Sequence, residues 1–131
     1  MSDTIHAVVT VSSNYTDEIT GYVGNLTAEL RDRLSASLRF RRLERVDAVP
    51  WTLLRERGAL DLVSRAAARG LVWHVAPRIG YRVPWTDFTA YNAAGDVVVR
   101  VAWEKGRVQR GYGYTGVAPA LRALDEAGVN Q

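Results

Sequence analysis

Residues 87–114 read DFTAYNAAGDVVVRVAWEKGRVQRGYGY, and this stretch decides the class of fold. Its strand-forming runs are Asp87–Tyr91, Asp96–Trp103 and Arg107–Tyr114, and the short segments between them end in Gly95 and Gly106. Glycine adopts the positive φ angles of tight hairpin turns without steric cost. The stretch therefore predicts an antiparallel β-meander in the last third of the chain.

The segments before the meander predict both strands and helices. Alternating or continuous apolar residues indicate strands over Ile5–Ser12 and Leu71–Ala76. In Thr16–Ala36 the apolar residues instead recur three to four positions apart, which is typical of one helical face. Trp51–Arg69 has a similar pattern with a break at Gly58, so it also indicates a helix.

Three other segments are less regular. Leu38–Val46 fits either a bulged strand or a second helix, and the alternation at its start favours the strand. Pro77–Pro84 is expected to be irregular because prolines bound it. Ala118–Ala127 predicts a short C-terminal helix with Gly128 as its stop.

These elements predict one α+β domain over residues 1–131, with a mixed or antiparallel sheet packed by two main helices. A length of 131 residues is within the usual range for a single domain. The middle strand of the meander has one apolar face, and we expect the long first helix to cover it. The residues of that face are Val97, Val99, Val101 and Trp103. Trp73 and Trp103 are expected in the core.

The composition excludes several classes of protein. Hydrophobic residues make up 47% of the chain and charged residues 24%, as in ordinary globular proteins. The absence of cysteine excludes disulfides, thiolate zinc sites and a cysteine nucleophile. A mean hydropathy of -0.13 and the lack of a long apolar run predict no membrane span. Met1–Thr4 lacks the features of a secretory signal, so we expect a cytoplasmic protein.

The basic residues are nearly all arginine. The net charge is +3 and the pI is 9.6, and Lys105 is the only lysine among 17 basic residues. This skew fits a GC-rich coding genome. It also fits a surface that binds phosphate, because the guanidinium group makes bidentate contacts with phosphate oxygens.

The phosphate-binding interpretation predicts a small non-catalytic protein that binds nucleic acid or another polyanion. Arginines would contact phosphates, and tyrosines would stack on bases. The predicted residues are Arg39, Arg41, Arg42, Arg107, Arg110, Tyr112 and Tyr114. The partner would be nucleic acid or an acidic protein surface, and no cofactor or metal is expected.

One run within this set resembles a known element. Residues 110–114, Arg-Gly-Tyr-Gly-Tyr, are similar to the first five positions of the RNP1 element of the RNA-recognition motif. That resemblance implies a central strand whose aromatic side chains stack on bases. Residues 115–117 do not continue the pattern, and Ile5–Val11 lacks the aromatic residue of the partner element. We do not assign the chain to that family on this match.

A second hypothesis is a protein–protein module, either a phage or mobile-element structural subunit or an inhibitor of a larger complex. Trp, Tyr and Arg are enriched among residues that dominate binding at protein interfaces. The predicted partner-binding residues are Trp51, Tyr81, Arg82 and Trp85. Assembly of such a module as a homo-oligomer is compatible with this hypothesis.

Catalysis has little support from the sequence. Phosphate loops, nucleophile elbows and dinucleotide fingerprints are all missing. Asp87, Asp96 and the pair Glu104-Lys105 only partly match a metal-dependent nuclease, because the acid and the lysine are adjacent. No catalytic residue is predicted, although a pocket lined by His6, His74 or Asp87 would favour an enzyme.

Overall fold

The computed structural model describes residues 4–11, 14–38, 41–79, 84–111 and 113–129. Over these residues the chain forms strands and helices in the following order. They are β1 (Ile5–Val11), β2 (Asp17–Gly24), α1 (Ala28–Leu38), β3 (Arg42–Val46), α2 (Trp51–Leu54), α3 (Ala59–Ala68), β4 (Val72–Ile79), β5 (Pro84–Tyr91), β6 (Val97–Glu104), β7 (Arg107–Val108) and α4 (Val117–Val129).

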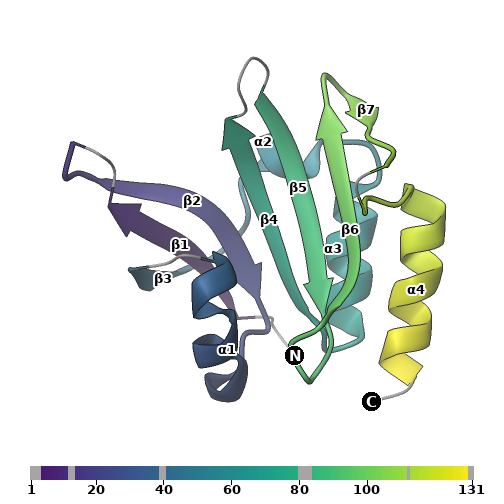
Figure 1. Ribbon diagram of the computed structural model, residues 1–131, viewed down its shortest axis with the longest axis horizontal. Coiled ribbons are helices and arrows are strands. Elements are labelled where there is room, and N and C mark those ends of the chain that lie inside the picture. The colour runs from purple at the N-terminus through teal and green to yellow at the C-terminus, as the bar shows by residue number, and fades with distance from the viewer. Residues whose placement is uncertain (1–3, 12–13, 39–40, 80–83, 112, 130–131) are drawn as a thin grey trace.

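All the described strands belong to one antiparallel sheet in the order β3-β1-β2-β4-β5-β6-β7 (Figure 1). The strands β1 and β2 form a hairpin, and β4 to β7 form a meander that pairs with β2 through β4. The predicted α+β class is therefore confirmed, and the sheet is antiparallel.

Helices lie on both faces of this sheet. α3 passes behind β4 to β6 in Figure 1, α4 lies beside it, and α1 lies in front of β1 and β2. Successive side chains of a strand point to opposite faces. Trp73, Phe88 and Trp103 therefore face α3 and α4, where Leu62 and Leu124 pack with them. α1 covers a smaller core on the other face, formed by Val8, Val23, Leu30, Leu34, Val72 and Tyr91.

The helix predicted over Thr16–Ala36 is wrong in its first half, which is strand β2. Its three-to-four spacing coincided with a strand, in which Gly21 and Gly24 lie against β4. A Cβ atom on Gly24 would lie 2.1 Å from Cε2 of Trp73, so only glycine fits there. α1 follows as a separate helix, and the Thr27 hydroxyl accepts a hydrogen bond from the Leu30 amide at 3.2 Å.

Other boundaries also differ from the predictions. β4 continues to Ile79, through part of the segment expected to be irregular. α4 does not stop at Gly128 but includes it, and Gly128 lies against the Arg69 side chain. Within Leu38–Val46, the first residue ends α1 and the strand begins at Arg42. Four helices are described rather than two main ones.

The meander is confirmed in outline, but its last strand is shorter than predicted. β7 contains only Arg107–Val108, because Gly111 and Gly113 have φ angles of 92° and 85° and turn the chain. Val99, Val101 and Trp103 of the predicted apolar face of β6 are covered by α3 and α4, not by the first helix, whereas Val97 is 53% exposed. Trp73 and Trp103 are buried, as predicted. No helix in the described ranges is long and apolar enough to cross a membrane.

Candidate nucleic-acid interface

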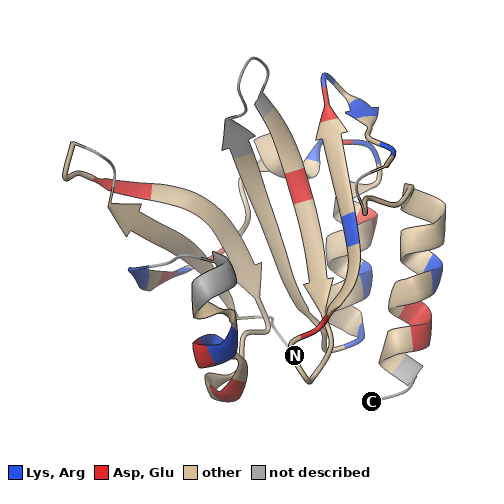
Figure 2. Ribbon diagram, in the orientation of Figure 1, with Lys and Arg blue, Asp and Glu red and all other residues tan. Residues whose placement is uncertain are grey.

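The predicted phosphate-binding arginines lie at two opposite edges of the sheet. Arg41 and Arg42 are at the β3 edge, while Arg107 and Arg110 are at the β7 edge. Figure 2 shows basic residues on both of these strands. The structure therefore does not bring the predicted set together on one surface. Four predicted site residues lie outside the described ranges: Arg39, Tyr81, Arg82 and Tyr112.

At the β3 edge, acidic neighbours neutralise Arg42. Its Nη2 atom lies 2.7 Å from Oε1 of Glu44 and 2.7 Å from Oδ2 of Asp17. Hydrogen bonds to Glu44 and then Asp17 raise the pKa of Arg42 above its usual value. A phosphate at this site would have to displace these carboxylates.

At the β7 edge, arginines from two parts of the chain surround an open groove. Arg107 and Arg110 come from the β6–α4 connection, and Arg57 comes from the loop before α3. The groove has a volume of about 1050 Å³ and continues along the start of α4. Unlike Arg42, none of these three guanidinium groups forms a salt bridge with a described residue. Asp61 also lines the groove and offsets one of the three charges.

Arg57 was not predicted, and its position follows from a buried tryptophan. The indole Nε1 of Trp103 donates a hydrogen bond of 2.8 Å to the carbonyl oxygen of Arg57. This bond attaches the α2–α3 loop to β6 beside the groove. The interaction joins segments 46 positions apart, so no local sequence pattern indicates it.

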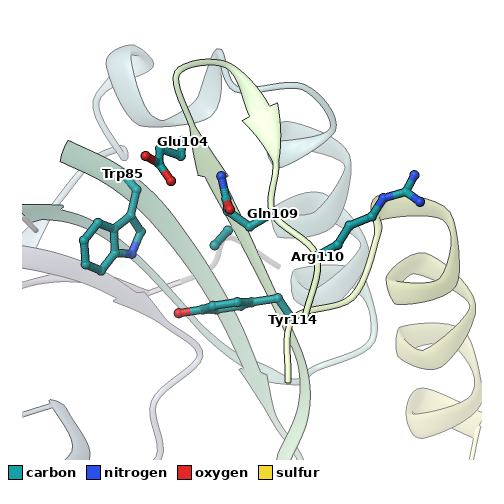
Figure 3. Close-up of a pocket in the computed structure, with 6 residues that line it drawn as sticks. Trp85, Glu104, Gln109, Arg110 and Tyr114 are labelled. Atoms are coloured by element: carbon teal, nitrogen blue, oxygen red, sulfur yellow. The ribbon is translucent and has the colours of Figure 1, made fainter. Parts of the chain in front are cut away.

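Next to the groove is a smaller hollow with aromatic walls (Figure 3). Its volume is about 190 Å³. Trp85, Ala102, Glu104, Gln109, Arg110 and Tyr114 line it. Trp85 and Glu104 are direct partners in the β5–β6 pairing, and Ala102 is buried at 1% exposure beneath them. Arg110 lines both the hollow and the groove.

Tyr114 reaches this hollow because its loop turns back onto β6. The amide of Gln109 donates to the carbonyl of Ala102 at 2.8 Å, and the amide of Thr115 donates to the carbonyl of Arg100 at 2.8 Å. Between these two bonds the Tyr114 amide donates to Gly111 at 3.0 Å, which closes a tight turn. The loop is therefore fixed to the outer strand at both ends.

The orientation of each aromatic ring is also fixed. The indole Nε1 of Trp85 donates a hydrogen bond of 2.8 Å to Oδ1 of Asp87, a residue with 6% exposure. The Cζ atom of Arg100 lies 5.0 Å from the centroid of the Tyr114 ring, within the range of a cation–π contact. A ligand entering the hollow therefore meets two walls that are already ordered.

The structure brings together residues that the sequence assigned to different hypotheses. Trp85 was predicted for a protein partner, and Arg110 and Tyr114 for nucleic acid, but all three line the same hollow. Trp51, from the first of these sets, is 65% exposed on α2 and does not line it. Gln109 and Glu104 were missed because the register of the loop on β6 is set by hydrogen bonds that no local pattern reveals.

The RNP1-like run does not have the position that the resemblance implies. Its described residues follow β7 at the edge of the sheet, and Gly111 and Tyr114 form only an isolated bridge. A central strand would have neighbours on both sides. The resemblance to the RNA-recognition motif therefore does not extend to the fold.

The two histidines lie in separate strands of the sheet, His6 in β1 and His74 in β4. His6 and His74 both pair with Val23, one from each side, so a strand separates them. Neither histidine lines the aromatic hollow, and neither does Asp87. Over the described part of the chain, no three His, Asp or Glu side chains gather as metal ligands would.

Comparisons with known proteins add no assignment. The chain matches no protein-family model, no curated protein and no solved structure. The groove and the hollow at the β7 edge are therefore the features that indicate a function.

Proposed function

We propose that this chain is a non-catalytic protein that binds nucleic acid at the β7 edge of its sheet. The binding surface is the groove lined by Arg57, Arg107 and Arg110, together with the adjoining aromatic hollow. Phosphates would lie in the groove, because guanidinium groups form charge-assisted hydrogen bonds with phosphate oxygens.

The observation that carries this proposal is the convergence of three arginines without carboxylate partners among the described residues. Arg57, Arg107 and Arg110 line one groove, whereas Arg42, Arg65 and Arg69 form salt bridges. An arginine that is already paired gains little from a phosphate, because the new contact replaces an existing one. Arg41 and Arg45 at the β3 edge also form no salt bridge with a described residue, so it is the convergence of three such arginines on one groove that favours the β7 edge.

The proposal predicts a strong dependence of affinity on salt. Binding to single strands releases counterions, and log K falls with log salt at a slope of about −0.7 per phosphate contacted. Three contacts give a slope of about −2. Fluorescence anisotropy with labelled DNA and RNA strands, between about 50 mM and about 200 mM salt, measures this slope.

Two variants locate the binding surface. The double variant Arg107→Ala, Arg110→Ala removes two phosphate contacts, so its slope should fall to about −0.7. Arg41→Ala removes a similar exposed charge from the opposite edge and should leave the slope unchanged. Absence of binding to any strand at low salt would overturn the proposal, and an equal effect of Arg41→Ala would refute the assigned surface.

A further inference from the structure

The geometry points to a more specific site: we infer that the hollow between Trp85 and Tyr114 holds one unpaired nucleobase and prefers adenine or cytosine to thymine. This inference rests on the proposed function and names the part of the ligand that enters the hollow. The adjoining groove would hold the phosphate attached to that nucleotide.

The size and walls of the hollow suit one planar ring system. Its volume of about 190 Å³ is below the range of roughly 300–1,000 Å³ of pockets for drug-sized molecules. Two walls are aromatic, and the small side chain of Ala102 lies between them. Arg100 contacts Tyr114 but does not line the hollow, so the ring keeps a face for stacking. A base in a duplex is stacked within its own helix, so an unpaired base is required.

The charges separate the base from the phosphate. Glu104 lines the hollow, and its carboxylate would repel a phosphate there. The arginines are concentrated in the groove, and Arg110 borders both sites. Figure 3 shows the Arg110 side chain directed away from Trp85, toward α4. An uncharged ring in the hollow and an anionic group in the groove match this arrangement.

The polar groups of the hollow indicate which bases are preferred. The Glu104 carboxylate is an acceptor only, and the Gln109 amide is both a donor and an acceptor. In Figure 3 both groups lie on the side of Tyr114 where Trp85 lies. The amino groups of adenine and cytosine donate to such acceptors, whereas thymine has a carbonyl oxygen in the corresponding position. We therefore expect cytosine or adenine to bind more tightly than thymine.

The test compares strands that share a backbone and differ in their bases. Anisotropy is measured at low salt with oligocytidine, oligothymidine and an abasic strand of equal length. The wild-type chain should bind oligocytidine more tightly than the other two. Tyr114→Leu should reduce the preference for oligocytidine over the abasic strand by about 5- to 150-fold, the range for loss of one stacked base, while the salt slope stays the same. Tyr114→Phe should retain stacking, and Glu104→Gln should weaken the preference for cytosine over thymine.

A matched control and a free ligand complete the experiment. Tyr15→Leu removes a tyrosine with 90% exposure on the β1–β2 connection and should change nothing. Cytidine monophosphate alone should quench Trp85 fluorescence, and Trp85→Phe should remove that quenching. If cytidine monophosphate displaces a labelled strand as effectively as an unlabelled strand does, the base site is supported, but its ligand is a free nucleotide.

Two results would overturn the inference in different ways. Equal affinity for the abasic strand and for oligocytidine would remove the base site and leave polyanion binding in the groove intact. Failure of every strand to bind would remove both the base site and the proposed function.

Discussion

Individual residues determine how closely β2 and β4 approach each other. Gly24 lies against the indole of Trp73, which is fully buried, and Gly21 lies against His74. Neither glycine has a positive φ angle. The requirement for glycine at these two positions is therefore steric, because a side chain at either one would clash with β4.

Gly24→Ala should destabilise the fold by about 1–3 kcal/mol, the usual cost of forcing an extra methyl group into a packed core. The added Cβ would lie 2.1 Å from Cε2 of Trp73, so the ring or the strand must move. Urea unfolding followed by circular dichroism measures the change in the free energy of unfolding. In a Trp73→Phe background the same substitution should cost less, because the contacting atoms of the indole are absent. An equal cost in both backgrounds would contradict the steric explanation.

Single residues also set a limit on prediction from sequence. The alternation in β6 and the turn glycines predicted the β5–β6 hairpin, because its contacts are local. The hollow depends on backbone hydrogen bonds from Gln109 and Thr115 to β6, which give no periodic signal. Tyr114 was therefore predicted as a binding residue, but the sequence did not indicate that Trp85 lines the same hollow.

Among the elements, α4 completes the larger core. Leu124 is fully buried in the cluster that contains Trp103 and Leu62, and Ala120 lies one turn before it. Arg65 and Arg69 of the α3 region also contact Asp125 of α4, at 2.7 Å and 2.8 Å. These ion pairs are partly exposed, so they contribute less than the apolar packing.

Leu124→Ala should lower the free energy of unfolding by about 2–5 kcal/mol, because it removes buried methyl groups and leaves a cavity. Leu60→Ala is the matched control on α3. Its side chain is 46% exposed, so the substitution should cost within about 0.5 kcal/mol. Thermal and urea unfolding measure both variants. Similar losses for the two would show that α4 does not stabilise the core as described.

An element was predicted correctly where its apolar pattern fitted only a strand or only a helix, and wrongly where the pattern fitted both. β6 was predicted to within one residue at each end because alternation and turn glycines agreed, whereas β4 was predicted to end three residues too early and β5 to begin three residues too late. Residues 17–24 were predicted as a helix because Ile19, Tyr22 and Val23 fit a helical face as well as a strand. Pairing of this segment with β1 and β4 decided the outcome, and that pairing is a tertiary effect.

The order of strands in the whole molecule was beyond reach of the sequence. β2 pairs with β4 across the intervening α1, β3, α2 and α3, and no local pattern specifies that contact. This order is what places the two groups of arginines at opposite edges. Because the sequence does not give the strand order, it could not show whether the predicted arginines share one surface. These arginines are Arg39, Arg41, Arg42, Arg107 and Arg110.

The stability of the whole molecule should fall below neutral pH because of His6. Its Nδ1 atom is buried and has no hydrogen-bond partner in the described residues. Desolvation, followed by repulsion from Arg45 and Arg31, lowers the pKa of His6 below its usual value of 6.5. The unfolded chain therefore binds a proton more readily than the folded chain. Stability is retained above pH 6.5 and is lost as the pH falls through the folded pKa.

His6→Gln tests this pH dependence. The variant has no titrating group at this position, so the difference between its stability and that of the wild type should change between about pH 7.5 and about pH 5. Unfolding free energies measured across that range give this difference directly. Parallel curves for the two proteins would show that His6 does not contribute.

The loop that carries Tyr114 also closes one side of the sheet. An outer strand with free carbonyl groups can recruit strands from other molecules and start aggregation. Here the amides of Gln109 and Thr115 already bond two carbonyls of β6, beyond the two residues of β7. The proposed ligand recognition and the protection against intermolecular β-pairing would thus depend on the same few residues. Substitutions that loosen this loop to alter selectivity would also expose the strand edge, so solubility constrains how this site can diversify.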